Sequence, residues 1–299
     1  MQDVVIIGGG AAGLTAALSL GRFRRKVVVF DTGNQANRVS HAAHGFFTRD
    51  GAAPSELIRI GHEQLQPYET VSLQSHEVTA ILPEDGHFSI TLDDGRTMMT
   101  RKVLLATGLK DELPPVPGLE QFWGTSVLHC PYCDGWEWRD QPLAILNDGA
   151  PAVHVAKLLR VLTTDLVVCT NGGNSLTEIE RSALELAGIQ VNETPIHHIE
   201  GHDGLVEAIV FEDSQRLERR AIFTRLTSTQ HAPFVSQLGC AMASEHLVQV
   251  DEFGRTSIPG VYAAGDLANR FRQISMAVAM GATAAAGINS ELIAEDFIA

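Results

Sequence analysis

Two cysteines separated by two residues have the clearest chemical potential in this sequence. Cys130 and Cys133 enclose a Pro-Tyr dipeptide, and Asp134 follows at once. A Cys-x-x-Cys pair can be half of a zinc site, a thiol–disulfide exchange pair, or two unrelated structural cysteines. A zinc site needs two further ligands, usually a second close pair, whereas Cys169 and Cys240 are isolated from each other. We therefore expect no metal here, and the rest of the chain must distinguish the two remaining alternatives.

The composition is typical of a soluble globular protein with room for two domains. The chain has 299 residues, of which 44% are hydrophobic and 19% are charged. Its net charge of -14 makes nucleic acid a poor partner. Four cysteines are too few for a disulfide framework, so we expect a cytoplasmic protein. In a reducing compartment a close cysteine pair is more often catalytic than structural.

A late apolar stretch, Ile274 to Ile288, raises the question of a membrane. It is rich in Ala and Gly and, at this length, too short to span a bilayer. The apolar run at residues 2–7 has no basic segment before it, which is unlike a signal peptide. We therefore expect no membrane association.

A nucleotide-binding pattern opens the chain. Val4–Ile7 is typical of a buried strand, after which a G-x-G-x-x-G pattern begins a helix. Gly8 permits a tight turn, Gly10 lets the backbone approach a pyrophosphate, and Gly13 lets helix and strand pack closely. Asp31 ends the next strand, where a carboxylate accepts hydrogen bonds from the ribose of an adenosine. Strand, helix and acid together predict a Rossmann-like dinucleotide site.

Two later segments complete this pattern and carry a family resemblance. Val103–Gly108 is a buried strand ending in Ala-Thr-Gly, and Ile258–Asp266 ends in Gly-Asp before Arg272 and Gln273. The order of G-x-G-x-x-G, Ala-Thr-Gly, Cys-x-x-Cys-Asp-Gly and Gly-Asp resembles the low-molecular-weight thioredoxin reductases along essentially the whole chain. The variant Cys-Pro-Tyr-Cys-Asp-Gly-Trp-Glu is more similar to the ferredoxin-dependent flavin thioredoxin reductases, the diflavin-linked disulfide oxidoreductases and the dithiol oxidases.

The resemblance implies an α/β fold with two Rossmann-like domains, doubly wound and three-layered, of the pyridine nucleotide-disulfide oxidoreductase type. Residues 1–112 and 242–299 would form a discontinuous FAD-binding domain, and residues 113–241 an NADPH-like domain that carries the dithiol. It also implies a homodimer. The residues assigned to FAD by the motifs and the resemblance are Gly8, Gly10, Ala11, Ala12, Gly13, Asp31, Gln35, Asn37, Val78, Thr107, Gly108, Gly265, Asp266, Arg272, Gln273 and Ile274.

The resemblance also implies a role for each reactive side chain. Cys133 would face the flavin, and Cys130 would exchange with the substrate as a thiolate. Asp134 matches the acid of this family, which protonates a departing thiolate or relays a proton through water. A carboxylate favoured by the start of a helix is the simpler interpretation of Asp134, and it is compatible with catalysis. We expect all three residues to be catalytic.

After the dithiol, the plan of the first domain is repeated. Strands are expected at Leu143–Leu146 and Asp165–Cys169, with a helix between them from Pro151 to Leu162. Ser175 and Glu178 have the spacing of a capping box, which predicts the start of a further helix.

This second copy lacks the marks of a nicotinamide site. Asn147 replaces the turn glycine, and Asp148 brings a carboxylate close to the position of the phosphates. The segment Cys169–Asn174 has neither an arginine cluster for a 2′-phosphate nor the acid that selects NADH. We expect no conventional NADPH use, so the domain is either a scaffold or holds another nucleotide, such as a second FAD. The residues of this second cleft are Asn147, Gly149, Ala150, Ala152, Thr170 and Asn171.

The sequence thus predicts an FAD-dependent thiol–disulfide oxidoreductase whose partner is a thioredoxin-like protein or a small disulfide or dithiol. The alternatives are a dithiol oxidase that uses oxygen and a flavin-binding redox sensor without turnover. Electrons could come from a weakly bound nicotinamide, a ferredoxin or substrate dithiols. Ferredoxins are acidic, and the basic cluster Arg22–Lys26 is a candidate docking face, although a solvated helix end explains it equally well.

Overall fold

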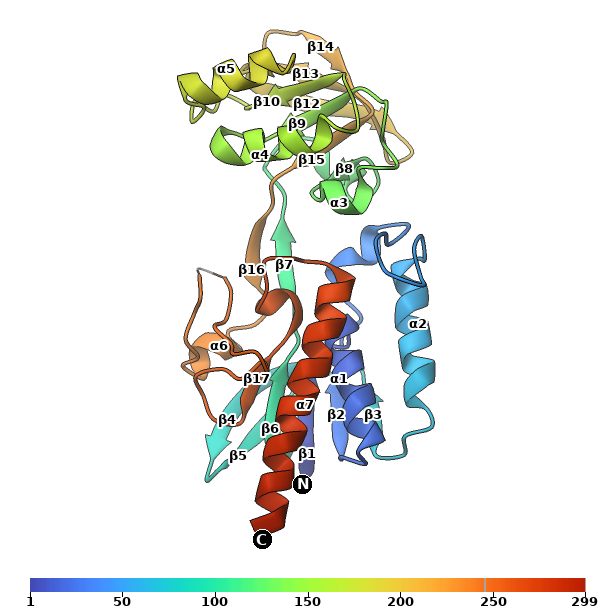
Figure 1. The fold of residues 1–299 in the computed structure, drawn as a ribbon, viewed down its shortest axis with the longest axis vertical. Helices are drawn as coiled ribbons and strands as arrows, with labels where there is room; N and C mark the ends of the chain where they lie inside the picture. Colours follow the sequence, from blue (N-terminus) through green and yellow to red (C-terminus); the bar gives the residue numbers. More distant parts are fainter. Residues whose placement is uncertain (245, 299) are drawn as a thin grey trace.

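The computed structural model describes residues 1–244 and 246–298, which form two α/β domains joined by a narrow connection (Figure 1). The first domain is built on a seven-stranded sheet with the order β3-β2-β1-β6-β5-β4, and β17 also pairs with β6. Its strands are β1 (Gln2–Ile7), β2 (Val27–Phe30), β3 (Val71–Gln74), β4 (Val78–Glu84), β5 (His87–Leu92), β6 (Thr97–Leu105) and β17 (Val261–Ala263). The strands β1, β2, β3, β6 and β17 are parallel, and the β4–β5 hairpin continues the sheet in antiparallel fashion.

Both faces of this sheet are covered, because the side chains of a strand alternate between its faces. Val4 and Ile6 of β1 pack on the helical side, under α1 (Ala11–Arg22) and α7 (Ile274–Ile298). Val5 and Ile7 belong to the opposite core. The other helical elements of this domain are α2 (Pro54–Leu65), α6 (Phe234–Gln237), η1 (Ala36–Val39) and η3 (Gly265–Leu267).

The long helix α7 corrects one prediction. It extends over 25 residues, so the argument that this apolar stretch is too short for a bilayer is wrong: α7 is long and apolar enough to cross a membrane by length and composition. In the structure it lies along α1 instead. A Cβ atom on Gly281 would lie 2.2 Å from the carbonyl oxygen of Ala12, so only glycine permits this close approach.

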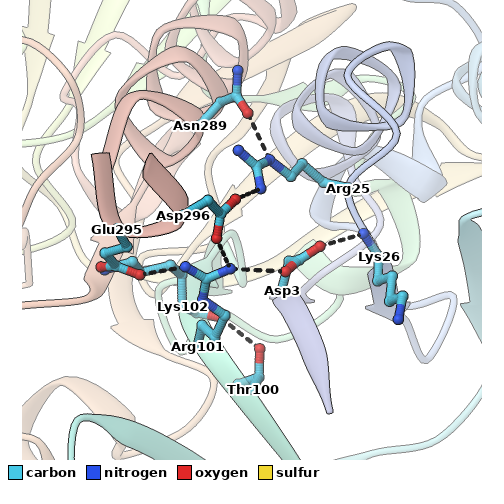
Figure 2. Close-up of polar contacts among 9 residues, drawn as sticks. All are labelled: Asp3, Arg25, Lys26, Thr100, Arg101, Lys102, Asn289, Glu295 and Asp296. Carbon is cyan, nitrogen blue, oxygen red and sulfur yellow. Dashed lines mark hydrogen bonds and ion pairs between the residues drawn. The ribbon is translucent and has the colours of Figure 1, made fainter. Parts of the chain in front are cut away.

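Ion pairs hold the C-terminal part of α7 to the sheet (Figure 2). The Arg101 guanidinium lies 2.7 Å from Asp296 and 3.3 Å from Asp3 at the start of β1. Lys102, whose side chain is 9% exposed, pairs with Glu295. For cations as buried as Arg101 and Lys102, the cost of desolvation offsets much of the attraction of each ion pair. We therefore interpret this network mainly as a device that fixes the position of α7.

The second domain repeats the plan with an all-parallel sheet of order β11-β10-β9-β15-β8. Two helices cover one face, and a three-stranded antiparallel sheet covers the other. The elements are β8 (Val127–Leu128), β9 (Leu143–Leu146), α4 (Gly149–Leu159), β10 (Leu166–Cys169), α5 (Glu178–Leu186), β11 (Gln190–Asn192), β12 (Ile196–His202), β13 (Leu205–Phe211), β14 (Arg216–Glu218), β15 (Ala221–Thr224) and η2 (Leu119–Phe122). The expected pair of three-layered α/β domains is confirmed.

The capping box predicted in this domain is wrong by two residues. Thr177 caps α5 by accepting a hydrogen bond from the backbone N–H of Glu180, whose side chain accepts from Thr177 in return. The predicted cap, Ser175, instead donates its backbone N–H to the carboxylate of Asp148.

The chain crosses between the domains as an antiparallel pair, β7 (Leu109–Glu112) and β16 (Thr227–Gln230) (Figure 1). The first crossing ends at Glu112. The second lies earlier than residue 241. Phe234 and Leu238, which the sequence analysis assigns to the second domain, pack in the core of the first, because their apolar side chains cover the face of β4 and β5.

Candidate active site

The dithiol lies in a single turn of helix, α3 (Pro131–Asp134), on the side of the second domain that faces the first (Figure 1). Cys130 and Cys133 form a disulfide with an S–S distance of 2.08 Å. The backbone N–H of Cys133 donates to the sulfur of Cys130 at 3.1 Å, and a donor directed at sulfur favours its thiolate after reduction. A Cβ atom on Gly135 would lie 2.4 Å from the Pro131 carbonyl oxygen, so this turn requires glycine at position 135.

The other two cysteines cannot join the pair in a metal site. Cys169 is buried in the core of the second domain, and Cys240 is buried in the core of the first.

Asp134 lies beside the dithiol in an environment that disfavours its charge. Burial raises its pKa to about 6, the negative charge of Glu137 acts in the same direction, and His44 opposes them. His44 belongs to the first domain, yet its Nε2 atom lies 3.5 Å from the Glu137 carboxylate. An acid with a pKa near 6 can both release and accept a proton close to neutral pH, as proton transfer to a departing thiolate requires.

A cavity of about 950 Å³ lies below the dithiol, mostly within the first domain. Of the sixteen residues assigned to FAD, fifteen line it; the exception is Gly13. At Gly13 there is no space for a side chain, because a Cβ atom would lie 1.9 Å from the Gly8 carbonyl oxygen. Gly13 therefore brings α1 close to β1, as the sequence analysis expects of it. Leu128, His129 and Asp134 of the second domain close the cavity from above.

One end of this cavity is suited to phosphate groups. Gly10 precedes α1, and no side chain caps the helix there, so the first N–H groups of α1 have no side-chain acceptor. A Cβ atom on Gly10 would have no other atom within 4 Å, which leaves open space in front of these donors. Asp31 follows β2 and accepts a hydrogen bond from the Gln35 amide at 2.8 Å. These are the donors and acceptors that an adenosine pyrophosphate needs.

The opposite end contains an ion-pair cluster that sequence reasoning did not find. Arg272 makes a two-pronged pair with Asp111 at 2.7 and 2.8 Å, and lies 3.3 Å from Asp266. It also donates to the Ser228 hydroxyl at 3.2 Å. Burial raises the pKa of Asp266, and Arg272 partly offsets this effect. In the sequence, the signal of Asp111 is limited to an acid just before a proline-rich segment.

In the second domain the corresponding turn is already filled by an internal anion. Asp148 caps α4, and its carboxylate accepts the N–H of Gly149 at 2.8 Å and the N–H of Ser175 at 2.8 Å. A Cβ atom on Gly173 would lie 2.5 Å from this carboxylate. Burial would raise the pKa of Asp148, but these N–H donors hold it below its usual range.

The residues predicted for the second cleft do not form an open cradle. The Thr170 hydroxyl donates to the carbonyl of Gly173, and the Asn171 amide oxygen accepts the N–H of Ile196 at 2.7 Å. Gly149 starts α4, Ala152 is buried, and Ala150 is exposed. Of the six, Asn147 lines a described cavity.

That cavity, of about 490 Å³, lies between the two domains. Asn147, Pro151 and His154 approach from the second domain, and Ser244 and Asn269 from the first. It meets the larger cavity at three shared residues, Leu109, His129 and Arg272.

Comparison with known proteins defines the class. The family of pyridine nucleotide-disulphide oxidoreductases matches residues 2–281, and the chain belongs to this family. Thioredoxin reductase aclD of Aspergillus oryzae is 32% identical over 97% of this chain and 96% of its own. TrxB of Bacillus anthracis, a protein assigned as a thioredoxin reductase, superposes with a TM-score of 0.95 at 35% identity, over 99% and 100% of the two chains. The structure of HlmI superposes with a TM-score of 0.94 at 36% identity, over 99% of this chain and 94% of its own.

Within that family the chain is a flavin-dependent disulfide oxidoreductase of thioredoxin-reductase type. The family implies FAD, and the first cavity fits it: the uncapped start of α1 would hold the pyrophosphate, Asp31 the ribose, and the segment from Asp266 to Ile274 the remainder of the cofactor. When bound, FAD supplies two-electron redox chemistry next to the dithiol.

Proposed function

We propose that this protein exchanges electron pairs between one FAD and the Cys130–Cys133 pair without using a conventional NADPH site. The observation that carries the proposal is the Asp148 carboxylate at the second dinucleotide turn. Two negative charges about 4 Å apart repel by about 1 kcal/mol in water and about 4 kcal/mol near a protein surface. The N–H groups of Gly149 and Ser175 would also not be available to a pyrophosphate, because both already donate to the Asp148 carboxylate.

The same reasoning favours one FAD per chain rather than two. FAD carries a pyrophosphate as NADPH does, so Asp148 opposes both at that turn. Heat release of the cofactor, followed by its absorbance against protein concentration, tests this directly. We expect a ratio near one, whereas a ratio near two would contradict the proposal.

The structure also bears on the electron donor. Of the basic cluster suggested for ferredoxin docking, Arg25 pairs with Asp296, and Arg22 donates to the hydroxyl of Tyr68. Arg22, Arg24 and Lys26 are exposed, so three of the four basic residues of the cluster still face solvent. We propose that substrate dithiols reduce the FAD, because this donor needs no nicotinamide at the turn that Asp148 occupies. We further propose that the protein is a cytoplasmic homodimer without membrane association.

Anaerobic mixing tests this direction of electron flow. Dithiothreitol should bleach the flavin band in the wild type, whereas millimolar NADPH should not. Cys130→Ser and Cys133→Ser should stay yellow and lose the response to dithiothreitol. Rapid bleaching by NADPH, or an undiminished response in either serine variant, would overturn the proposal.

Oxidation of small dithiols by oxygen is the second candidate, and the blocked dinucleotide turn favours it because it needs no nicotinamide. In that reaction a dithiol loses two electrons and two protons to form a disulfide, and oxygen gains them as hydrogen peroxide. Catalytic dithiol consumption with matching peroxide would support it. A flavin that dithiols reduce once, without turnover in air, would instead indicate a redox sensor.

A further inference from the structure

The cavity between the domains is lined by cationic side chains, although the chain as a whole carries a net charge of -14. Arg225, Arg270 and Arg272 line it together with three histidines, and its described lining contains no carboxylate. Arg272 is neutralised by Asp111 and Asp266. Arg225 and Arg270 are different: within residues 1–244 and 246–298, neither guanidinium makes a hydrogen bond or an ion pair, and both residues are exposed.

The position of these two arginines points to a ligand. Arg225 directly follows β15, and Asn147 directly follows the adjacent parallel strand β9. Ligands of open α/β sheets bind in the crevice beyond the carboxyl ends of such strands. Arg270 approaches the same crevice from the first domain, between η3 and α7. An anion held there would contact both domains at once.

The cleft also leads toward the reactive sulfurs. His129 lines both the inter-domain cleft and the larger cavity, and the next residue in the chain is Cys130. Asp148 occupies the turn where a dinucleotide would place its phosphates, so that half of the original site is closed. The half beside the dithiol keeps unpaired positive charge.

We propose that this cleft holds the carboxylate of an acidic small-molecule disulfide or dithiol. This proposal rests on the function proposed above. Two guanidinium groups can bind a carboxylate through charge-assisted hydrogen bonds. In exchange with a disulfide R–S–S–R, one cysteine thiolate attacks a substrate sulfur and R–S⁻ leaves, taking up a proton. The second cysteine thiolate then closes the Cys130–Cys133 disulfide and releases R–SH. Two electrons pass from the cysteine pair to the substrate; oxidation of a dithiol is the reverse.

Three small disulfides of different charge test this proposal. The holoenzyme is reduced anaerobically with two equivalents of dithionite, which supply the four electrons that the FAD and the cysteine pair take up. It is then mixed with an excess of 3,3′-dithiodipropionate, bis(2-hydroxyethyl) disulfide or cystamine, which are anionic, neutral and cationic. Return of the flavin band gives the rate. We expect half-saturation by the dianion at a concentration about tenfold lower than by the neutral disulfide, with cystamine weakest, because about 1.4 kcal/mol of binding corresponds to tenfold. Raising the salt concentration should reduce the difference.

Variants locate the effect. The double variant Arg225→Gln/Arg270→Gln should lose the preference for the dianion, because loss of a binding charge raises the half-saturating concentration of the dianion. Its rate with the neutral disulfide should stay within about twofold of the wild-type rate. Lys157→Gln removes the same charge from exposed α4 outside the cleft and should keep the preference. Calorimetry of the oxidised holoenzyme with 3,3′-dithiodipropionate should show binding weakened about tenfold in the double variant.

The outcomes separate this proposal from the function on which it depends. If the neutral disulfide reacts but the three substrates show no order by charge, the cleft proposal is wrong and the exchange reaction stands. If no disulfide reoxidises the flavin, the proposed exchange reaction is wrong. Calorimetry with 3,3′-dithiodipropionate then still tests whether the cleft binds the dianion. Binding of inorganic phosphate or ADP-ribose that depends on Arg225, without binding of the dianionic disulfide, would overturn the carboxylate assignment.

Discussion

The two domains have the same strand–turn–helix, and the two turns treat an anion in opposite ways. At the first turn Gly10 leaves the start of α1 uncapped and the space in front of it open. At the second turn Asp148 caps α4 and ties it to Ser175, so the donors are already satisfied. One site is prepared for an external phosphate, and the other contains its own anion. A shared fold therefore does not imply a shared ligand, because one side chain decides whether the helix terminus is available.

The largest test of this comparison transfers the carboxylate to the first turn. Gly10→Asp should lower the affinity for FAD at least about 100-fold, because the added charge lies against the pyrophosphate. Gly10 has an ordinary backbone conformation, with φ of -76°, so the variant should fold. The apo form should even gain about 1 kcal/mol from the new cap. Cofactor titration and urea unfolding of the apo protein measure both effects; a yellow variant with unchanged affinity would contradict the comparison.

Asp134 provides the next test, because its pKa moves in the opposite direction to that of Asp148. Burial raises the pKa of Asp134 from 3.8 to about 6, so folding favours its protonated form. This contribution to stability is complete below pH 3.8 and is lost as the pH rises through about 6. Asp134→Asn should therefore be more stable than the wild type at pH 8, by about 2–3 kcal/mol, and nearly equal at pH 4.

Urea unfolding of both proteins at several pH values measures this difference. In the dithiol reaction, the change in wild-type rate near pH 6 should be missing in Asp134→Asn. An equal stability difference at pH 4 and pH 8 would show that the carboxyl group titrates normally.

Removing the internal anion is the converse of the first experiment. Asp148→Gly frees the N–H groups of Gly149 and Ser175, and we expect about tenfold tighter binding of ADP-ribose. Asp148→Asn keeps a cap without the charge and should lie between the wild type and the glycine variant. Bleaching by NADPH should remain slow in both, because no arginine follows β10. Calorimetry with ADP-ribose checks the order of the three proteins, and identical affinities would show that Asp148 does not control the site.

The prediction with the smallest effect tests whether the two domains unfold independently. Thr177→Ala removes the cap of α5 and should destabilise the second domain by about 1 kcal/mol. The first domain and its FAD content should not change. Urea unfolding is followed by flavin fluorescence, which reports the first domain, and by far-ultraviolet circular dichroism, which reports both domains. An equal shift in both signals would indicate that the domains unfold as one unit.

Much of the first site could be predicted from the sequence because its signals are local. The glycines of the first turn and Asp31 lie within one strand–helix–strand unit, and the dithiol and Asp134 are consecutive. The change at the second turn could also be predicted, because Asn147 replaces the expected glycine and Asp148 adds a carboxylate next to it. The assignment of Ser175 as a helix cap failed because Asp148, 27 residues earlier, had already bound its N–H.

Contacts between distant segments could not be predicted. Asp111 and Arg272 are 161 residues apart, and no periodicity or motif connects them. His44 meets Glu137 only because the domains face each other. The membrane argument failed for a related reason, since the apolar stretch was measured without the ten residues that extend α7 to Ile298.

The Arg272 cluster has a mechanical consequence. Its guanidinium binds Asp111 on β7 and Ser228 on β16, the two strands that carry the second domain. Both strands are thereby joined, at the paired positions Asp111 and Ser228, to the segment that precedes α7. A rotation of the second domain must then take place in the part of the connection between these contacts and the second domain. The contacts thus allow reorientation of the second domain but resist sliding of the two strands.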